Sequence, residues 1–254
     1  MVKGRGSGLK PFFTYFGGKY RAALKYPAPV HDEIIEPFAG SAGYSVRHPD
    51  RKVTLIDLDE RVAGTWEYII NAGESEVRRL PLWDGSWGTV DDLNIPQEAR
   101  WLIGWWLNQG ASSPGKSPSA WVRSGRYPNS VWGEAVRERI ASQQHRVRHW
   151  KIICGSYEDA PDKTATWFID PPYQVAGKSY RHGARGIDFN ALGGWCKRRP
   201  GQAIVCENEG ADWLPFRFLG QSLATPGAGR SGVSAESVWT SIDDEERKVE
   251  WAGG

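Results

Sequence analysis

One apolar strand that ends in an acid and two prolines constrains the fold of this chain more than any other segment. The strand is predicted over residues 164–170, and Asp170-Pro171-Pro172-Tyr173 forms its end and the following loop. Each proline fixes its φ angle and lacks an N–H group, so a central strand cannot continue there. The loop presents acceptors, the Asp170 carboxylate and backbone carbonyls, at a strand end where open α/β folds bind ligands. On its own, the pattern fits a simple strand-ending turn equally well.

Strand and helix patterns alternate along the chain. An apolar strand over residues 31–37 runs into the glycine turn 38–43, after which a helix can begin. Residues 52–59 predict a second strand and residues 60–72 a helix, which makes a βαβ unit with a helix after it. Strand patterns return at 202–207 and 233–242. We therefore expect an α/β fold with a largely parallel sheet and helices on both faces.

The middle of the chain has a different pattern. Residues 73–150 contain several tryptophans, a Gly/Ser/Pro run at 110–119 and a basic, helix-like stretch at 132–150. We interpret this segment as an inserted, mostly helical subdomain, with residues 1–72 and 151–254 forming the core domain. Most of the fourteen tryptophans are expected to be buried.

Positive charge is concentrated in the same segment. From Lys116 to Lys151 there are eight Lys and Arg against two Glu, a local charge of +6 that leaves −4 for the rest of a chain with net charge +2. Such segregation is expected of a surface that binds a phosphate backbone, and a solvated helix face is the alternative.

A glycine turn followed by an acid indicates a nucleoside-bearing cofactor. Glycines let the backbone approach the cofactor closely, and Asp57, at the end of the next strand, is placed to receive ribose hydroxyls. This pattern alone suits a nicotinamide cofactor equally well. The earlier segment Gly17-Gly18-Lys19 suits a ligand with a carboxylate. It does not fit a phosphate-binding loop, because Phe13 and Tyr20 stand where Gly and Ser or Thr are needed.

Other classes of protein are disfavoured. No run approaches the roughly 18 to 20 apolar residues of a membrane span, and the first ten residues lack the apolar core of a signal peptide. Three cysteines without a CxxC pair argue against a disulfide framework or a zinc knuckle. His145 and His149 have metal-binding spacing but no evident third ligand. We expect a cytoplasmic monomer, from a bacterium or phage-infected cell, without a metal or a membrane partner.

Three segments together resemble the Dam-type DNA adenine N6-methyltransferases. Tyr15 and Gly17-Gly18-Lys19 resemble the N-terminal cofactor motif of that family, Glu36-Pro37-Phe38-Ala39-Gly40 its glycine motif, and Asp170-Pro171-Pro172-Tyr173 its catalytic motif. The motif order also matches. The 126 residues between Gly43 and Asp170 leave room for the target-recognition insert of the family.

The resemblance implies a Rossmann-like class I S-adenosylmethionine-dependent methyltransferase core with an inserted, mostly helical DNA-recognition subdomain. It implies that the S-adenosylmethionine contacts come from Tyr15, Lys19, Phe38, Gly40, Asp57 and Asp170. Tyr157 falls where the family approaches the cofactor adenine. Two positions depart from the family pattern. Ala42 stands at the second glycine of Phe-x-Gly-x-Gly, and Asp59 stands where Asn is common.

The implied reaction is methyl transfer to N6 of an adenine flipped out of duplex DNA. The amine would donate hydrogen bonds to Asp170 and to the Pro171 carbonyl, and Tyr173 would stack on the purine. The expected DNA contacts are Arg123, Arg126, Arg146, Arg148, Lys151 and, in the polar loop after the catalytic motif, Tyr180. Methylation of an exocyclic amine in RNA, and a non-catalytic DNA-binding protein on the same fold, remain as alternatives.

Overall fold

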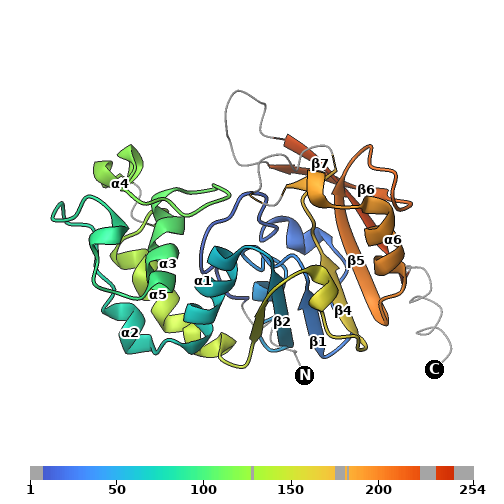
Figure 1. Ribbon diagram of the computed structural model, residues 1–254, viewed down its shortest axis with the longest axis horizontal. Coiled ribbons are helices and arrows are strands. Elements are labelled where there is room, and N and C mark those ends of the chain that lie inside the picture. The colour runs from blue at the N-terminus through green and yellow to red at the C-terminus, as the bar shows by residue number, and fades with distance from the viewer. Residues whose placement is uncertain (1–7, 127–128, 175–180, 182, 224–232, 243–254) are drawn as a thin grey trace, which may run out of the picture.

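The structure, a computed structural model, describes residues 8–126, 129–174, 181, 183–223 and 233–242. Its centre is a seven-stranded sheet with the spatial order β3-β2-β1-β4-β5-β7-β6 (Figure 1). Strands β1 to β5 run parallel, and β7 is antiparallel to both of its neighbours. This mixed α/β sheet with one reversed strand is consistent with the class I methyltransferase fold. The strands are β1 Glu33–Glu36, β2 Lys52–Asp57, β3 Lys151–Cys154, β4 Ala165–Ile169, β5 Gly201–Asn208, β6 Arg217–Leu223 and β7 Val233–Thr240.

Continuous apolar runs in the central strands supply a core on both faces of the sheet. Successive strand residues point to opposite faces. Ile34 accordingly belongs to one hydrophobic cluster and Ile35 to the other. Helix α1 (Glu60–Asn71) covers the first face through Trp66, and α6 (Phe189–Lys197) covers the second through Trp195. Helices on both faces leave the carboxyl edge of the sheet as the open end.

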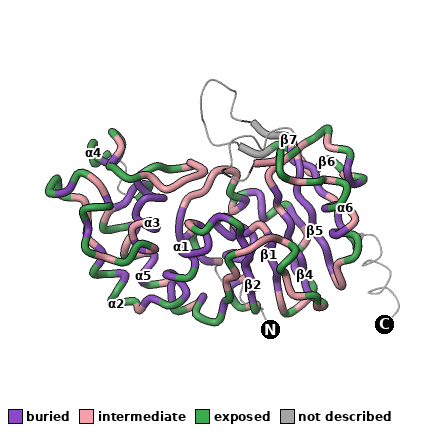
Figure 2. The backbone as a smooth tube through the Cα atoms, viewed as in Figure 1, coloured by how far each residue is buried: buried purple, intermediate pink, exposed green. Residues whose placement is uncertain are grey.

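The segment that follows α1 and precedes β3 alternates α-helices with loops and 3-10 turns. It forms α2 Glu74–Arg78, α3 Gln97–Leu107, α4 Ala120–Ser124 and α5 Glu134–Gln144. Its apolar side chains join the same cluster as α1, and Figure 2 shows buried backbone continuing from the sheet into α3. The indole Nε1 of Trp105 on α3 donates to Thr65 Oγ1 on α1 at 3.0 Å. Whether residues 73–150 act as a separate subdomain stays a prediction. The buried tryptophans are Trp66, Trp87, Trp105, Trp106, Trp132, Trp150, Trp167, Trp195 and Trp213, which confirms that most are core residues.

The largest departure from the sequence prediction lies after the glycine turn. No α-helix joins β1 to β2 there, and the described chain forms only a 3-10 turn, η2 Ser45–Arg47. The glycine turn takes residues 38–43, and residues 44–51, about two helical turns in length, must also return the chain to the start of β2. The βαβ unit predicted for this segment was therefore wrong in its helix and right in its parallel strands.

Several element boundaries follow from local chemistry. β2 ends at Asp57, two residues earlier than predicted, because Asp59 caps α1 by accepting a hydrogen bond from Arg61 N at 3.0 Å. The basic stretch predicted as one helix over 132–150 is α5 followed by the 3-10 turn η4 His145–Val147. The other 3-10 helices are η1 Ala22–Lys25, η3 Val90–Asp92, η5 Tyr157–Asp159 and η7 Ala184–Gly186. In the described parts of the chain, every helix is too short or too polar to cross a membrane.

Candidate functional site

A pocket opens at the carboxyl ends of β1, β2 and β4. The glycine turn after β1, the loop after β2 and the start of the 170–173 loop all contribute to its wall. The N-terminal segment 15–19 forms another side, and residues 155–157 after β3 form a further one. Three motifs that lie far apart in the sequence therefore meet in one cavity, because parallel strands bring their carboxyl ends to the same edge.

The glycine turn is built for close approach. Gly40 has φ +45°, and a Cβ atom added there would lie 2.9 Å from Tyr15 Cδ1. Its N–H donates to Asp57 Oδ2 at 2.9 Å, and its carbonyl accepts from Trp66 Nε1 at 2.8 Å. Ala42 has φ +48°, a left-handed conformation that costs a non-glycine residue about 1–2 kcal/mol. Ala42 thus has the left-handed backbone conformation that a glycine at this position would adopt at lower cost.

A second glycine fixes the N-terminal segment against this turn. A Cβ atom on Gly43 would lie 2.5 Å from Tyr20 N and 2.8 Å from the carbonyl carbon of Lys19. The backbone of residues 19–20 therefore rests directly on the turn. This contact carries Lys19 into the pocket although it precedes β1 in the sequence.

The end of β2 holds two carboxylates with different surroundings. Asp57 is buried, and its Oδ1 accepts from Asp59 N at 2.9 Å while its Oδ2 accepts from Gly40 N. Burial raises the pKa of Asp57 to about 6, and the two backbone hydrogen bonds oppose that shift. Asp59 forms an ion pair with Arg61. Burial alone would raise the pKa of the Asp59 carboxyl, but the hydrogen bonds and charge of Arg61 outweigh it, so the pKa lies below its ordinary value.

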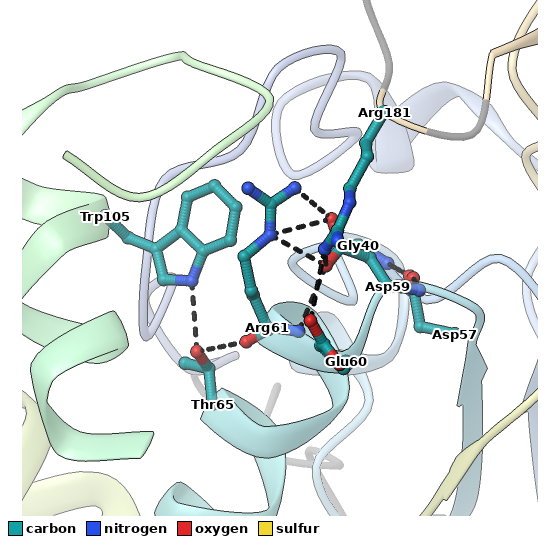
Figure 3. A network of polar contacts seen from close by, with 8 residues as sticks. All are labelled: Gly40, Asp57, Asp59, Glu60, Arg61, Thr65, Trp105 and Arg181. Atoms are coloured by element: carbon teal, nitrogen blue, oxygen red, sulfur yellow. Dashed lines mark hydrogen bonds and ion pairs between the residues drawn. The ribbon is translucent and has the colours of Figure 1, made fainter. Parts of the chain in front are cut away.

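Arg181 joins this cluster from across the pocket. Its Nη1 lies 3.5 Å from Asp59 Oδ1 and 3.3 Å from Glu60 Oε1. Figure 3 shows the guanidinium groups of Arg61 and Arg181 converging on Asp59. Arg181 thus connects the chain that follows the 170–173 loop to the start of α1.

The Asp170 carboxylate faces a cation inside the pocket. Lys19 Nζ lies 2.9 Å from Asp170 Oδ1, and it donates to the Gly17 carbonyl at 2.9 Å. The same ammonium lies 4.7 Å from the centre of the Tyr173 ring. Only 6% of the Lys19 side chain and 18% of the Asp170 side chain are exposed. Burial raises the pKa of Asp170 above its ordinary value, against the lowering effect of Lys19.

Two buried glutamates hold the 170–174 loop in place. Tyr173 donates from its hydroxyl to Glu236 Oε2 on β7 at 2.8 Å, and Tyr26 donates to the same oxygen at 3.3 Å. Glu207 on β5 accepts from Gln174 N at 3.1 Å. Strands β5 and β7 thus hold the end of the loop, and Pro172, just before the two anchored residues, lines the pocket.

Another buried acid lies at the end of β1. Glu36 is 2% exposed, and its Oε1 accepts from Ser45 N at 2.7 Å. Burial raises the pKa of Glu36 to about 8, with the nearby Asp170 charge acting in the same direction. Because Glu36 lines the pocket, a cationic ligand group there would shift it toward its ionised form.

The far wall of the pocket is aromatic and apolar. The rings of Phe38 and Tyr157 stack at 5.5 Å with an interplanar angle of 27°, and Trp195 supports Tyr157 edge-on at 5.1 Å. Leu58 is 54% exposed, and together with Ile187 it lines the same cavity. An aromatic pair beside the exposed Leu58 and the partly buried Ile187 is suited to a flat heterocycle.

The structure brings together the residues expected to bind the cofactor. Tyr15, Lys19, Phe38, Gly40, Asp57 and Asp170 all line the pocket. Pro172 also lines the pocket, whereas Pro171 is buried and Tyr173 contacts Lys19 without lining the pocket themselves. Glu36, Arg181, Glu207 and Glu236 were not singled out from the sequence. The position of Glu36 in the glycine motif was the one available signal, since the other three act through contacts between distant elements.

The expected DNA contacts do not form one surface. Arg123 and Arg126 are exposed on and just after α4, which Figure 1 shows at the top of the molecule, where the strands have their carboxyl ends. Residues 145–151 lie at the bottom, where β3 begins. There Arg146 pairs with Asp50 at 2.7 Å, while Arg148 and Lys151 are exposed. This second group therefore lies on the opposite edge of the sheet from Asp170, and Tyr180 lies outside the described residues.

His145 and His149, whose spacing alone could suggest a metal site, lie in the same region. His149 Nε2 lies 2.9 Å from the carbonyl oxygen of Arg51. Among the described residues, no three His, Cys, Asp or Glu side chains are grouped so that they could hold a metal ion. Of the free cysteines, Cys154 is exposed and Cys196 and Cys206 are buried.

Comparisons with known proteins give only distant likenesses. No family model matches the chain, and no curated protein matches it. Similar solved structures include a "putative methylase" from Haemophilus influenzae, with 12% identity and a TM-score of 0.34 over 83% of this chain and 80% of that one. A "putative methyltransferase" from Escherichia coli has 11% identity and a TM-score of 0.33 over 87% and 79%. A "conserved hypothetical protein" from Streptococcus pyogenes has 8% identity and a TM-score of 0.33 over 82% and 83%. Likenesses this low carry no argument about activity.

Proposed function

We propose that this chain is an S-adenosylmethionine-dependent DNA adenine N6-methyltransferase. The observation that carries the proposal is the position of Asp170. Its carboxylate opens the Asp-Pro-Pro-Tyr loop and lines the same pocket as the glycine turn and Asp57. An acceptor-rich loop and a nucleoside-type cradle thus share one cavity, as transfer of a group from a nucleoside cofactor to an amine requires.

The groups that line the pocket fit S-adenosylmethionine. The close approach at Gly40 would accommodate the ligand backbone, and Asp57 has carboxylate lone pairs left for ribose hydroxyls after its two backbone contacts. The stacked pair Phe38 and Tyr157, with Leu58, would hold the adenine ring. Glu36 would face the ammonium group of the methionine portion. When bound, this cofactor supplies an electrophilic methyl group.

The loop residues would prepare the target amine. The Asp170 carboxylate and the Pro171 carbonyl are acceptors, and hydrogen bonds from both N–H groups of an adenine N6 would free its lone pair. Pro171 has no N–H, so the loop offers no competing donor at that position. Tyr173, fixed by Glu236, would form the stacking platform for the purine, a contact worth about 1–3 kcal/mol.

Two features favour DNA as the substrate. The motif order resembles that of the Dam-type enzymes, and α4 presents exposed Arg123 and Arg126 beside a loop that reaches the pocket. The carbonyl of Ala111 in that loop accepts from Phe16 N at 3.1 Å. A nucleic acid lying over α4 would therefore pass close to the opening that leads to Asp170.

The deciding experiment is methyl transfer from radiolabelled S-adenosylmethionine to duplex DNA, followed by nucleoside analysis. We expect N6-methyladenine in DNA, with structured RNA as the competing substrate in parallel reactions. Asp170→Ala should lower the rate by about 100-fold or more, weaken cofactor binding and leave DNA binding largely intact. The control is Asp162→Ala, an acid that is 78% exposed and remote from the pocket. Unchanged turnover in Asp170→Ala, or label that appears only in RNA, would contradict the proposal.

A further inference from the structure

Lys19 contacts the catalytic loop more directly than the sequence pattern indicates. The resemblance assigned this lysine to the cofactor. In the structure its ammonium lies 2.9 Å from Asp170 Oδ1 and 4.7 Å from the Tyr173 ring centre, with 6% of the side chain exposed. The Gly17 carbonyl accepts a further hydrogen bond from it at 2.9 Å. A buried ammonium held by two oxygens and an aromatic face has a defined position rather than a mobile one.

The surroundings of Asp170 disfavour its ionised form. The described groups that interact electrostatically with Asp170 include acids or weak acids on β1, β5, β7, its own loop and the segment after η1, namely Glu36, Glu207, Cys206, Glu236, Tyr173 and Tyr26. In that described set, Lys19 is the one cation. A negative charge on any of these neighbours would push the Asp170 carboxyl toward protonation.

Protonation of Asp170 would weaken the role that the proposed function gives it. A carboxylate accepts hydrogen bonds from an amine with both oxygens, whereas a carboxylic acid presents a donor on one of them. A protonated Asp170 would therefore keep one acceptor oxygen and turn a donor toward the amine, whose lone pair must stay free for the methyl group.

We infer that Lys19 is a positioning residue for catalysis, whose ammonium keeps the Asp170 carboxylate ionised and turned into the pocket. The inference rests on the proposed function for the role of Asp170. The ionic contact itself does not depend on turnover, so it can be measured in the resting protein. The close packing of Gly43 against the Lys19 backbone gives the ammonium its fixed place.

The test is a titration of the Asp170 carboxyl carbon by NMR in protein labelled with ¹³C-aspartate, assigned with Asp170→Asn. In Lys19→Met we expect the midpoint to rise by about 1–3 pH units, the usual effect of losing an adjacent opposite charge. Lys19→Arg keeps the charge and should stay close to wild type. Lys19→Gln, which keeps a donor without the charge, should follow Lys19→Met and replaces it if that variant folds poorly. Lys10→Met, an exposed lysine in the same N-terminal segment, is the matched control.

Activity and cofactor binding separate this role from that of a cofactor ligand. In Lys19→Met the methyl-transfer rate should fall about tenfold for each pH unit below the new midpoint and recover toward alkaline pH, with the Kd for S-adenosylmethionine changed less than threefold. An unchanged Asp170 midpoint would overturn the inference. A tenfold or greater loss of cofactor affinity with that midpoint unchanged would assign Lys19 to the cofactor instead. A raised midpoint in a protein that methylates no nucleic acid would support the ionic role and contradict the proposed function.

Discussion

At the scale of single residues, Gly43 shows how one missing side chain positions the site. An added Cβ would lie 2.5 Å from Tyr20 N, so Gly43→Ala should push the Lys19–Tyr20 backbone away from the glycine turn. We expect a loss of about 1–3 kcal/mol in the free energy of unfolding, typical of overpacking, together with weaker S-adenosylmethionine binding. Urea denaturation and calorimetric titration measure the two effects.

Gly88 provides the matched control for that substitution. It is exposed, and an added Cβ would meet no atom within 4 Å. Gly88→Ala should change the free energy of unfolding by no more than about 0.5 kcal/mol and leave cofactor binding unchanged. If the two glycine variants lose equal stability and equal affinity, close packing of the Lys19 segment is not what Gly43 provides.

At the scale of elements, the two groups of basic residues occupy opposite edges of the sheet and should contribute differently to DNA binding. A protein that neutralises phosphates loses affinity as salt rises, with a slope of about 0.9 per phosphate contact. The double variant Arg123→Ala/Arg126→Ala, on and just after α4, should lower that slope by about 2. DNA affinity measured by fluorescence anisotropy from low to moderate salt gives the slope directly.

The opposite edge supplies the comparison. Arg146, Arg148 and Lys151 lie where β3 begins, and Arg146 is already paired with Asp50. Replacing these three residues with alanine should leave the salt slope near the wild-type value. A flatter slope in this triple variant, with the α4 variant unaffected, would place the DNA on the opposite edge of the sheet from the pocket.

Elements with dense apolar patterns were predictable, and sparse ones were not. β4 and β5 carry uninterrupted apolar runs, and both were predicted within one or two residues. β3 has four residues at an assumed domain boundary, and β6 contains Gly220 and a register shift, so neither was predicted. Tertiary pairing stabilises such strands, and the sequence alone does not reveal that pairing.

The same distinction applies to the site. Asp170, Lys19 and Asp57 belong to short motifs whose chemistry is visible in the sequence. Glu236 reaches Tyr173 across 63 residues, and Glu207 reaches Gln174 across 33. Contacts of this range depend on which strands become neighbours, and the reversed strand β7 brings Glu236 back beside the loop. The sequence therefore indicated the groups that belong to short motifs and missed the groups that hold them in place.

At the scale of the whole molecule, the fold gathers carboxyl groups at one edge of the sheet. Glu36 ends β1, Asp57 ends β2 and Asp170 follows β4, and burial raises the pKa of each. A carboxyl whose pKa is raised by folding stabilises the folded state most at low pH. That contribution is lost as the pH rises from the unfolded value to the folded one. The ligand-free protein should therefore lose stability between about pH 4.5 and 8, the window set by Glu36.

Glu36→Gln tests this gathering of acids, because glutamine keeps the shape of the side chain and cannot ionise. Each pH unit within the window changes the wild-type free energy of unfolding by up to about 1.4 kcal/mol through Glu36. The stability of the variant relative to wild type should therefore rise from pH 5 to pH 8 in urea unfolding experiments. Glu67→Gln, at an exposed position on α1, accounts for the general effect of removing one carboxyl. If the wild-type and Glu36→Gln curves run parallel across that range, Glu36 ionises alike in the folded and unfolded chain, and burial at the sheet edge is not what controls it.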